Sequence, residues 1–411
     1  MGLKLTGESG TSMKNFLYSV FLTALILTPF FTVSAQGIVI ERDGKQANPT
    51  LVFQGIRGNS ELSALVLDNL IKCGWFDVRR GGAADYLVSG TASGNDLQLS
   101  LMNGAGRKIA DFRVSDRNAD QTAAAAVDNI LRHEFKIPGI CKSKIVFSVE
   151  VAPGKREIYM CDFNGRNITR LTTNNTLSVE PAWSPDGQSI VYCYYGMTYT
   201  NLIQYRFDIN KSRRLTRYKG LNAGGDLSPD GKYVALVLAR DNQVDLYIRP
   251  TEGGDLIRLT RDSAVEASPA WTPDGRQICY VSDLNGRPQL YMIDPFRRPA
   301  PRRLTTLRGS ERVTPDFSYE GRLAYSARVG GDYVITVADV QNPAALRSEK
   351  AGLPDAPEIV GEGPSWAPDG RHVVVADRGA LYVVDTRLGA KRRLLGGKSR
   401  TFQPDWSPLL P

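Results

Sequence analysis

Histidine is almost absent from this sequence of 411 residues. Only His133 and His372 occur, which is too few for a histidine metal cluster together with a catalytic base. The G-x-S-x-G motif, which forms the nucleophile elbow of α/β-hydrolases, is also missing. Aspartates recur in a repeat, but their even spacing does not bring them to one metal ion. We therefore predict a protein that is not an enzyme and that binds neither a metal ion nor a cofactor.

Cysteine is scarce and irregularly placed. Its five copies are an odd number without a C-x-x-C motif or a common spacing, which excludes a disulfide framework. Three of them lie in apolar, strand-like runs and are expected to be buried small hydrophobic residues: Cys161, Cys193 and Cys279. A bridge between Cys73 and Cys141 stays open as an alternative, since an oxidising compartment would allow it.

Long hydrophobic runs are missing after residue 35. The one such run, residues 16–33, follows Lys14 and precedes Ala35 in a small-residue pattern that signal peptidase cleaves. The run is long enough to span a bilayer, but Pro29 and the cleavage pattern argue against an anchor. We expect residues 1–35 to be a signal peptide and the remainder to be exported. Two start positions are compatible with this: Met1 and Met13.

Charge of one sign does not dominate the chain. The formal net charge is +8, with 23% charged and 42% hydrophobic residues, which are ordinary values for a globular protein and exclude wholesale disorder. The arginines are spread through the sequence and do not form one block. A nucleic-acid partner is therefore not expected.

One short motif occurs six times in the C-terminal two thirds of the chain. In each copy an apolar or aromatic residue precedes Ser-Pro-Asp-Gly or a variant of it. Proline presets φ at the first turn position and glycine adopts the left-handed conformation, so each copy predicts a hairpin turn. Gly187, Gly231 and Gly275 follow one another at intervals of 44 residues. The copies span 183–187, 227–231, 271–275, the degenerate 317–321, 366–370 and the truncated 406–408.

Each turn belongs to a unit of four predicted short strands. The strands after the turns are expected at 189–195, 233–238, 277–282, 322–327 and 372–376, the third strands at 157–160, 245–248, 289–292 and 380–383, and the fourth at 170–172, 214–216, 258–260, 303–305 and 393–395. Four strands per 40 to 49 residues is the period of a propeller blade. Residues 141–411 are therefore predicted to form a six-bladed β-propeller.

The ends of the repeat predict how the ring closes. The first unit has no turn motif before it, and the last motif has no unit after it. The strand that contains Trp406 is therefore expected to complete the blade that begins at Ile145.

Residues 36–140 lack the repeat and predict a small α/β domain. A helix is expected to start at Asn59 or Ser60 and to stop at Gly74, and a second helix should span 120–135. The apolar faces expected for the two helices are Leu62, Leu65, Val66, Leu70 and Ile71, and Ala123, Ala126, Val127, Ile130 and Leu131. Strands are predicted at 75–79, 86–92, 97–102 and 108–114, and a linker at 136–140. The fold class is thus mainly β, with a propeller preceded by a signal peptide and this domain.

The order of these parts resembles the TolB family of the Tol-Pal envelope system. The resemblance is carried by the domain order, the junction Ile137-Pro138-Gly139-Ile140 and the turns at Trp183, Trp271 and Trp366, with a final copy at Trp406. It implies a periplasmic scaffold that binds a Pal-like lipoprotein through the propeller and a TolA-like inner-membrane protein through its N-terminal segment. This role serves outer-membrane integrity, cell division and protein import.

The alternative is a propeller related to prolyl-oligopeptidase-type hydrolases. That class needs a separate hydrolase domain, and the roughly 100 residues outside the propeller are too few to form one.

Two sets of partner-binding residues are expected. Gly37-Ile38-Val39-Ile40-Glu41 resembles the family segment that binds TolA; it is either a mobile strand for strand addition or an edge strand of its own domain. The loops that enter the innermost strands should line the mouth of the propeller channel: Glu180, Leu221, Asn222, Ala223, Gly224, Glu266, Ala267, Ser268, Arg312, Thr314 and Glu362. The resemblance associates positions 221, 224 and 267 with Pal, but Leu221 and Gly224 depart from the family's residue types.

Overall fold

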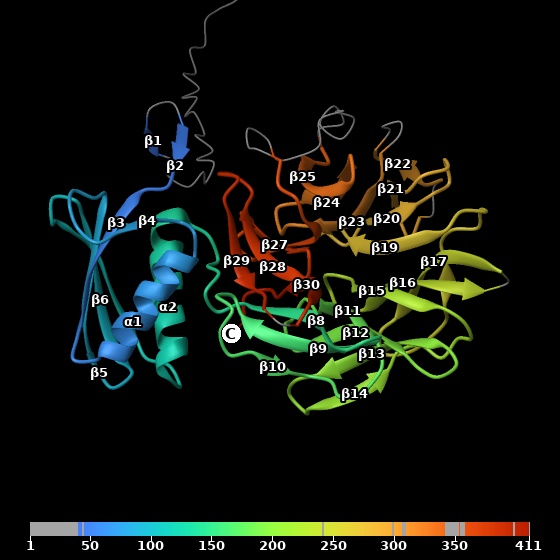
Figure 1. Ribbon diagram of the computed structural model, residues 1–411, viewed down its shortest axis with the longest axis horizontal. Helices are drawn as coiled ribbons and strands as arrows, with labels where there is room; N and C mark the ends of the chain where they lie inside the picture. Colours follow the sequence, from blue (N-terminus) through green and yellow to red (C-terminus); the bar gives the residue numbers. More distant parts are fainter. Residues whose placement is uncertain are drawn as a thin grey trace, which may run out of the picture. The chain divides into compact units, whose positions relative to one another are not determined.

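The computed structural model describes residues 40–42, 45–240, 242–297, 300–305, 310–341, 353, 358–397 and 399–410. These residues belong to one compact unit (Figure 1). The expected signal peptide and Gly37, Ile38 and Val39 lie outside the described residues. Within the described part, no helix is long and apolar enough to cross a membrane.

The N-terminal domain is a five-stranded sheet with two helices. The strand order is β4 (Asp77–Arg79), β3 (Thr50–Arg57), β5 (Tyr86–Ser93), β6 (Asp96–Asn103), β7 (Lys108–Val114), with β3 parallel to both neighbours. Helices α1 (Ser60–Lys72) and α2 (Ala119–Phe135) pack together on this sheet (Figure 1). The sequence pattern did not predict β3, because a bulge at Gly55, where φ is +91°, interrupts its alternation.

The first helix begins at Ser60, as predicted, and the second begins at Ala119, one residue before its predicted start. The side chain of Asn59 accepts the N–H of Leu62, and Asn118 accepts the N–H of Gln121, so each helix has an asparagine N-cap. The predicted apolar faces are buried, except for Ile71, which is 54% exposed. The prediction for Ile71 was wrong because it follows Leu70 directly and the next helical step turns it away from the core.

A separate hairpin precedes this domain. Strands β1 (Ile40–Arg42) and β2 (Lys45–Ala47) pair antiparallel as a two-stranded sheet of their own. Ile40 and Glu41 therefore do not form an edge strand of the five-stranded sheet.

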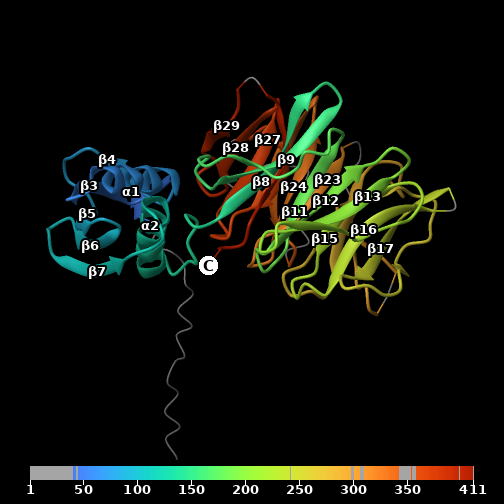
Figure 2. The same ribbon diagram turned by 90° about the horizontal axis from the view of Figure 1, so that it is seen from below.

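The propeller of six blades is confirmed among the described residues (Figures 1 and 2). From the innermost strand outward, the first blade consists of β30 (Thr401–Trp406), β8 (Lys144–Ala152), β9 (Lys155–Asp162) and β10 (Thr169–Arg170). The second consists of β11 (Ser178–Trp183), β12 (Ser189–Tyr195), β13 (Thr200–Arg206) and β14 (Lys211–Arg214). The third consists of β15 (Asn222–Leu227), β16 (Tyr233–Arg240), β17 (Gln243–Pro250) and β18 (Ile257–Arg258). The others are β19 (Glu266–Trp271), β20 (Ile278–Ser282), β21 (Gln289–Ile293), β22 (Arg302–Arg303); β23 (Arg312–Phe317), β24 (Arg322–Val329), β25 (Asp332–Asp339); and β26 (Glu362–Trp366), β27 (His372–Asp377), β28 (Ala380–Asp385), β29 (Lys391–Leu395).

The ring closes as predicted. Trp406 of β30 pairs with Ile145 of β8, so the last strand of the chain completes the first blade. The innermost strands of neighbouring blades contact one another around the whole ring. Arranging the blades in a closed ring leaves the innermost strands with only short edges, which the neighbouring blades protect around the channel.

The fourth strands differ from their prediction. In four blades they end at the arginine of the Arg-Leu-Thr triplet; the threonine that follows is buried, and the leucine is buried except for the half-buried Leu171. In the sixth blade the predicted strand at 393–395 is confirmed as the end of β29. In the second blade, the Thr216 hydroxyl accepts the N–H of Leu202 on the third strand. The threonine side chain thus replaces a ladder hydrogen bond, which is why the strand stops there.

The cysteine predictions are resolved by burial. All five cysteines are described, buried and free, so the bridge between Cys73 and Cys141 is not formed. Burial raises the pKa of the Cys73 thiol to about 12. Cys161, Cys193 and Cys279 are buried small residues, as predicted.

A buried polar network joins the α/β domain to the sixth blade. Trp75 Nε1 donates to Asp369 Oδ2 at 2.9 Å, and the same oxygen lies 2.6 Å from His372 Nδ1. The Arg371 guanidinium lies 4.7 Å from the Trp75 ring centroid and pairs with Asp385. In three other blades the turn aspartate accepts from a Ser or Thr hydroxyl two residues before it, but Ala367 stands at this position in the sixth blade. Asp369 is therefore available to hold the α/β domain.

Candidate interaction surface on the propeller

A bulge in each innermost strand forms a ring around the channel. In all six strands the pairing shifts at equivalent positions. The residue at the bulge has a positive φ in every blade: Glu180 (52°), Gly224 (63°), Ser268 (45°), Thr314 (51°), Gly363 (59°) and Gln403 (47°). Five of these residues precede proline, which lacks a ladder donor and is tolerated at a bulge.

The bulges correct the prediction for the channel mouth. The expected partner-binding residues were assigned to loops, but all except Leu221 lie within the innermost strands. The sequence did not predict the bulge, because a stretch that contains proline and interrupts the strand alternation looks like a loop of the same length. The structure does bring these residues to the same end of five neighbouring innermost strands, with Leu221 directly before one of them.

Burial divides the predicted residues into two groups. Asn222, Ala223, Glu266 and Arg312 are buried, so their side chains do not offer a surface to a partner. Glu362 is exposed, and the half-buried residues are Glu180, Leu221, Gly224, Ala267, Ser268 and Thr314. The accessible set thus contains seven of the eleven predicted residues.

Two of the buried residues have local polar partners. Ser282 Oγ donates to Glu266 Oε1 at 3.2 Å, and burial raises the pKa of Glu266 to about 8. Arg312 donates to the carbonyl oxygen of Glu311 at 3.0 Å. These groups therefore belong to the framework beneath the mouth.

Hydrogen bonds between bulges connect three blades. The N–H of Glu180 donates to Gln403 Oε1 at 3.3 Å, and the N–H of Gly224 donates to Glu180 Oε2 at 3.1 Å. Burial raises the pKa of the Glu180 carboxyl. The series stops at Gly224, because glycine has no side chain to continue it.

Three carboxylates line the channel two residues after the bulge. Asp226, Asp316 and Asp405 each accept the backbone N–H of a tryptophan on the next blade at 2.7 Å. Desolvation, with a smaller contribution from repulsion between the carboxylates, raises the pKa of Asp226 to about 7. Desolvation also raises the pKa of Asp405 to about 6 and that of Asp316 well above its ordinary value.

Sequence reasoning missed these three carboxylates. The available signal was an alternation at the repeat position directly before the last residue of each innermost strand. This position holds alanine or serine in one blade and aspartate in the next: Ala182, Asp226, Ala270, Asp316, Ser365, Asp405. No group of three or more Asp, Glu, His or Cys residues in the described part has a geometry that could hold a metal ion.

A hollow of about 380 Å³ opens beside the bulges of the first two blades. Glu180 and Gln403 form one side, and Lys155, Arg156 and Tyr195 are among the other lining residues. The Arg156 guanidinium lies 3.7 Å above the Phe402 ring centroid, and that of Arg400 lies at 5.0 Å. The nearby hairpin tip at Met197 is fully exposed. This end of the propeller therefore combines apolar and charged groups around a concave surface.

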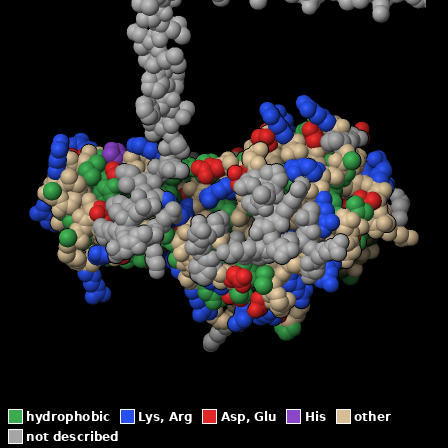
Figure 3. Space-filling model, turned by 90° about the horizontal axis from the view of Figure 1, so that it is seen from above, with side chains coloured by type: hydrophobic (Ala, Val, Ile, Leu, Met, Phe, Trp, Pro, Cys, Tyr) green, Lys and Arg blue, Asp and Glu red, His purple; other side chains and the backbone are tan. Residues whose placement is uncertain are grey.

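Basic side chains do not gather into a nucleic-acid stripe on the face shown in Figure 3. Lys and Arg side chains there are scattered among Asp and Glu. The two histidines are also separate: His133 is exposed on α2, whereas His372 is buried at the domain junction. The scattered charges on this face are of the kind that discourages pairing between exposed strand edges of different molecules.

The comparisons with known proteins agree with this architecture. The family described as "TolB beta propeller domain" matches residues 135–410. The Tol-Pal system protein TolB of Anaeromyxobacter dehalogenans (strain 2CP-1 / ATCC BAA-258) is 33% identical over 192 residues, which are 46% of this chain and 44% of the relative. That of Wolinella succinogenes is 25% identical over 285 residues, 63% and 65% of the two chains. The chain thus spans less than two thirds of the length of these curated relatives.

A solved structure extends the likeness to most of the chain. The crystal structure of TolB from Acinetobacter baumannii covers 88% of this chain and 97% of its own, with a TM-score of 0.77 and 21% identity. At this identity the likeness concerns the fold, including the α/β domain before the propeller.

Proposed function

The chain belongs to the TolB beta propeller family, and on this premise we propose that it is a non-catalytic, periplasmic binding scaffold of a Tol-Pal system. The observation that carries the proposal is the ring of bulges at one end of the channel, which presents half-buried and exposed side chains from six blades on a closed framework. A surface of this kind suits a protein partner, since it is broad and held by rigid strands.

The proposed partner at this surface is a Pal-like lipoprotein. The bulge end of the propeller supplies the hollow between the first two blades and the accessible residues Leu221, Gly224, Ala267 and Glu362. Mixed apolar and charged lining is typical of a non-obligate interface. Residues 37–41 are proposed to bind a TolA-like inner-membrane protein, and residues 1–35 to direct export. Together these contacts link the two membranes for envelope integrity and division.

Calorimetry on residues 36–411 with the periplasmic domain of the Pal-like lipoprotein tests the proposal. Reversing charge at the exposed mouth with Glu362→Arg, together with Leu221→Glu, should weaken binding at least tenfold while the melting temperature stays within a few degrees. Lys232→Glu is the matched control, because Lys232 is 75% exposed and lies at the turn end of the third blade. Wild-type protein that binds no such lipoprotein, or mouth variants that bind it unchanged, would contradict the proposal.

Removal of residues 36–41 tests the second contact separately. The truncated protein should lose binding to the TolA-like protein and keep both its affinity for the lipoprotein and its melting temperature. Undiminished binding to the TolA-like protein would refute the role of this segment.

A further inference from the structure

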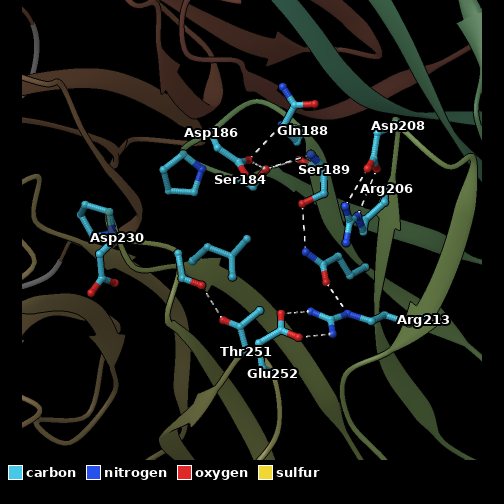
Figure 4. A pocket seen from close by; sticks show the side chains of 15 residues that line it. Ser184, Asp186, Gln188, Ser189, Arg206, Asp208, Arg213, Asp230, Thr251 and Glu252 are labelled. Carbon is cyan, nitrogen blue, oxygen red and sulfur yellow. Dashed lines mark hydrogen bonds and ion pairs between the residues drawn. The ribbon is translucent and has the colours of Figure 1, made fainter.

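A second hollow lies between the second and third blades, at the opposite end of the innermost strands from the bulges. Its volume is about 420 Å³, within the range of roughly 300–1,000 Å³ that is common for small-molecule sites. Figure 4 shows Ser184 and Ser189 on one side, Arg206 and Arg213 on a second, and Thr251 and Glu252 on a third.

The second blade has a short residue at a position where the other blades have long ones. In every blade the residue after the innermost strand donates its N–H to one carbonyl at the start of the second strand. Ser189 occupies this position in the second blade. The equivalent residues are Lys144, Tyr233, Gln277, Arg322 and His372. A serine here leaves the space that larger side chains occupy elsewhere.

The floor of the hollow is polar where the repeat is otherwise apolar. Gln204 lies on the third strand opposite Val191 and is 7% exposed. Its Nε2 donates to Ser189 Oγ at 2.9 Å, and its Oε1 accepts from Arg213 Nε at 2.7 Å. The equivalent residues of the other blades are Met160, Ile248, Met292, Val337 and Val383. A buried amide in place of an apolar side chain destabilises a core unless it is hydrogen-bonded, and these two hydrogen bonds hold the Gln204 amide in a fixed orientation at the hollow.

Both arginines that line the hollow are paired with carboxylates. Arg213 donates to both carboxylate oxygens of Glu252 at 2.7 and 3.0 Å, and Arg206 donates to both oxygens of Asp208 at 2.6 and 3.1 Å. An ionic ligand would have to break such a pair, whereas a neutral ligand would not. Strands β12 and β13 are each paired on both sides, so neither of them offers an edge to a peptide.

We propose that this hollow binds a neutral saccharide. Fixed amide, hydroxyl and guanidinium groups suit the hydroxyls of a sugar, and Leu227 with Pro229 offers an apolar wall for a ring face. Ser189 provides the space, and Gln204 supplies the buried amide that orients the ligand. The site is distinct from the proposed protein-binding mouth, which lies at the other end of the channel.

Saturation-transfer NMR and calorimetry on residues 36–411 test the site, with an N-acetylglucosamine trimer, maltotriose and spermidine as probes. Binding of the trimer alone indicates an amide-bearing glycan, and binding of both sugars a general saccharide site; either result supports the proposal. Binding of spermidine alone, or of no probe, overturns it.

Two variants place residues of the third blade at the equivalent positions of the second blade, and they test whether the sugar binds in this hollow. Ser189→Tyr and Gln204→Ile introduce the residues of the equivalent positions, Tyr233 and Ile248, and each should weaken sugar binding more than tenfold. Gln277→Tyr, the same change in the fourth blade, is the matched control and should bind as the wild type does. Unchanged sugar binding by Gln204→Ile with a native melting temperature would overturn the proposal, even if Ser189→Tyr fails to fold.

Discussion

The Oδ2 atom of Asp405 accepts the backbone N–H of Trp183 at 2.7 Å, which joins the last strand of the chain to the second blade. Asp226 and Trp271 repeat this relationship, as do Asp316 and Trp366. The six innermost strands are therefore linked in three pairs by carboxylates that face the channel. Because desolvation raises their pKa values, these links make stability depend on pH.

Replacing Asp226 with asparagine should stabilise the protein at alkaline pH. The pKa of Asp226 rises on folding from 3.8 to about 7, so between these values the folded state binds more protons than the unfolded state. Stability then falls as pH increases through this window and stays low above it. Asparagine keeps an acceptor for Trp271 and has no charge. Thermal unfolding should show a higher melting temperature for Asp226→Asn than for wild type at pH 8, and little gain at pH 4.

Asp230 offers a control, because its pKa is shifted in the opposite direction from that of Asp226. It is an exposed turn carboxylate whose pKa is lowered, chiefly by a hydrogen bond from Ser228. Asp230→Asn should therefore not gain stability at pH 8. An equal gain in both variants would show that net charge, and not the channel, is responsible.

The junction network should be sensitive to Asp369. Asp369→Asn places an amide among the donors of Trp75, Arg371 and His372, and breaking a buried charged network of this kind costs about 3–5 kcal/mol. The same change at the equivalent turn position, Asp230→Asn, should cost no more than about 0.5 kcal/mol, since that side chain is at the surface. Urea unfolding measures the difference, and equal midpoints would contradict it.

The α/β domain should depend on Gly58. This residue has a φ of +91°, and a Cβ atom there would lie 2.2 Å from the carbonyl oxygen of Ala92. Gly58→Ala should therefore destabilise the protein by several kcal/mol, well above the roughly 1 kcal/mol that a left-handed alanine costs without a clash. Gly94→Ala supplies that reference, because its φ is +58° and no atom lies within 4 Å of the added Cβ. Circular dichroism melts of the two variants compare them directly.

Thiol titration tests the state of the cysteines. All five are buried, and buried thiols with raised pKa values react slowly. Native protein should not react with a disulfide reagent within minutes, and all five thiols should react in guanidinium without reductant. Reaction of only three thiols in guanidinium would indicate a disulfide bridge between Cys73 and Cys141.

Local sequence chemistry was sufficient for the propeller and for its closure. Pro-Asp-Gly turns and alternating apolar strands act over a few residues, so the six blades, the helix cap at Asn59 and the pairing of Trp406 with Ile145 could all be predicted. Residues at the channel mouth could be placed on one end of the ring for the same reason.

Accessibility and pairing were decided by the tertiary structure. Whether Glu266 and Arg312 are buried, or Asp369 meets Trp75, depends on segments that approach only when the ring is closed, up to 294 residues apart. The hollow at Ser189 likewise becomes visible only when the pairing register aligns it with Tyr233 and His372. Turns and strands follow from neighbouring residues, whereas burial, pKa values and cavities follow from packing between distant ones.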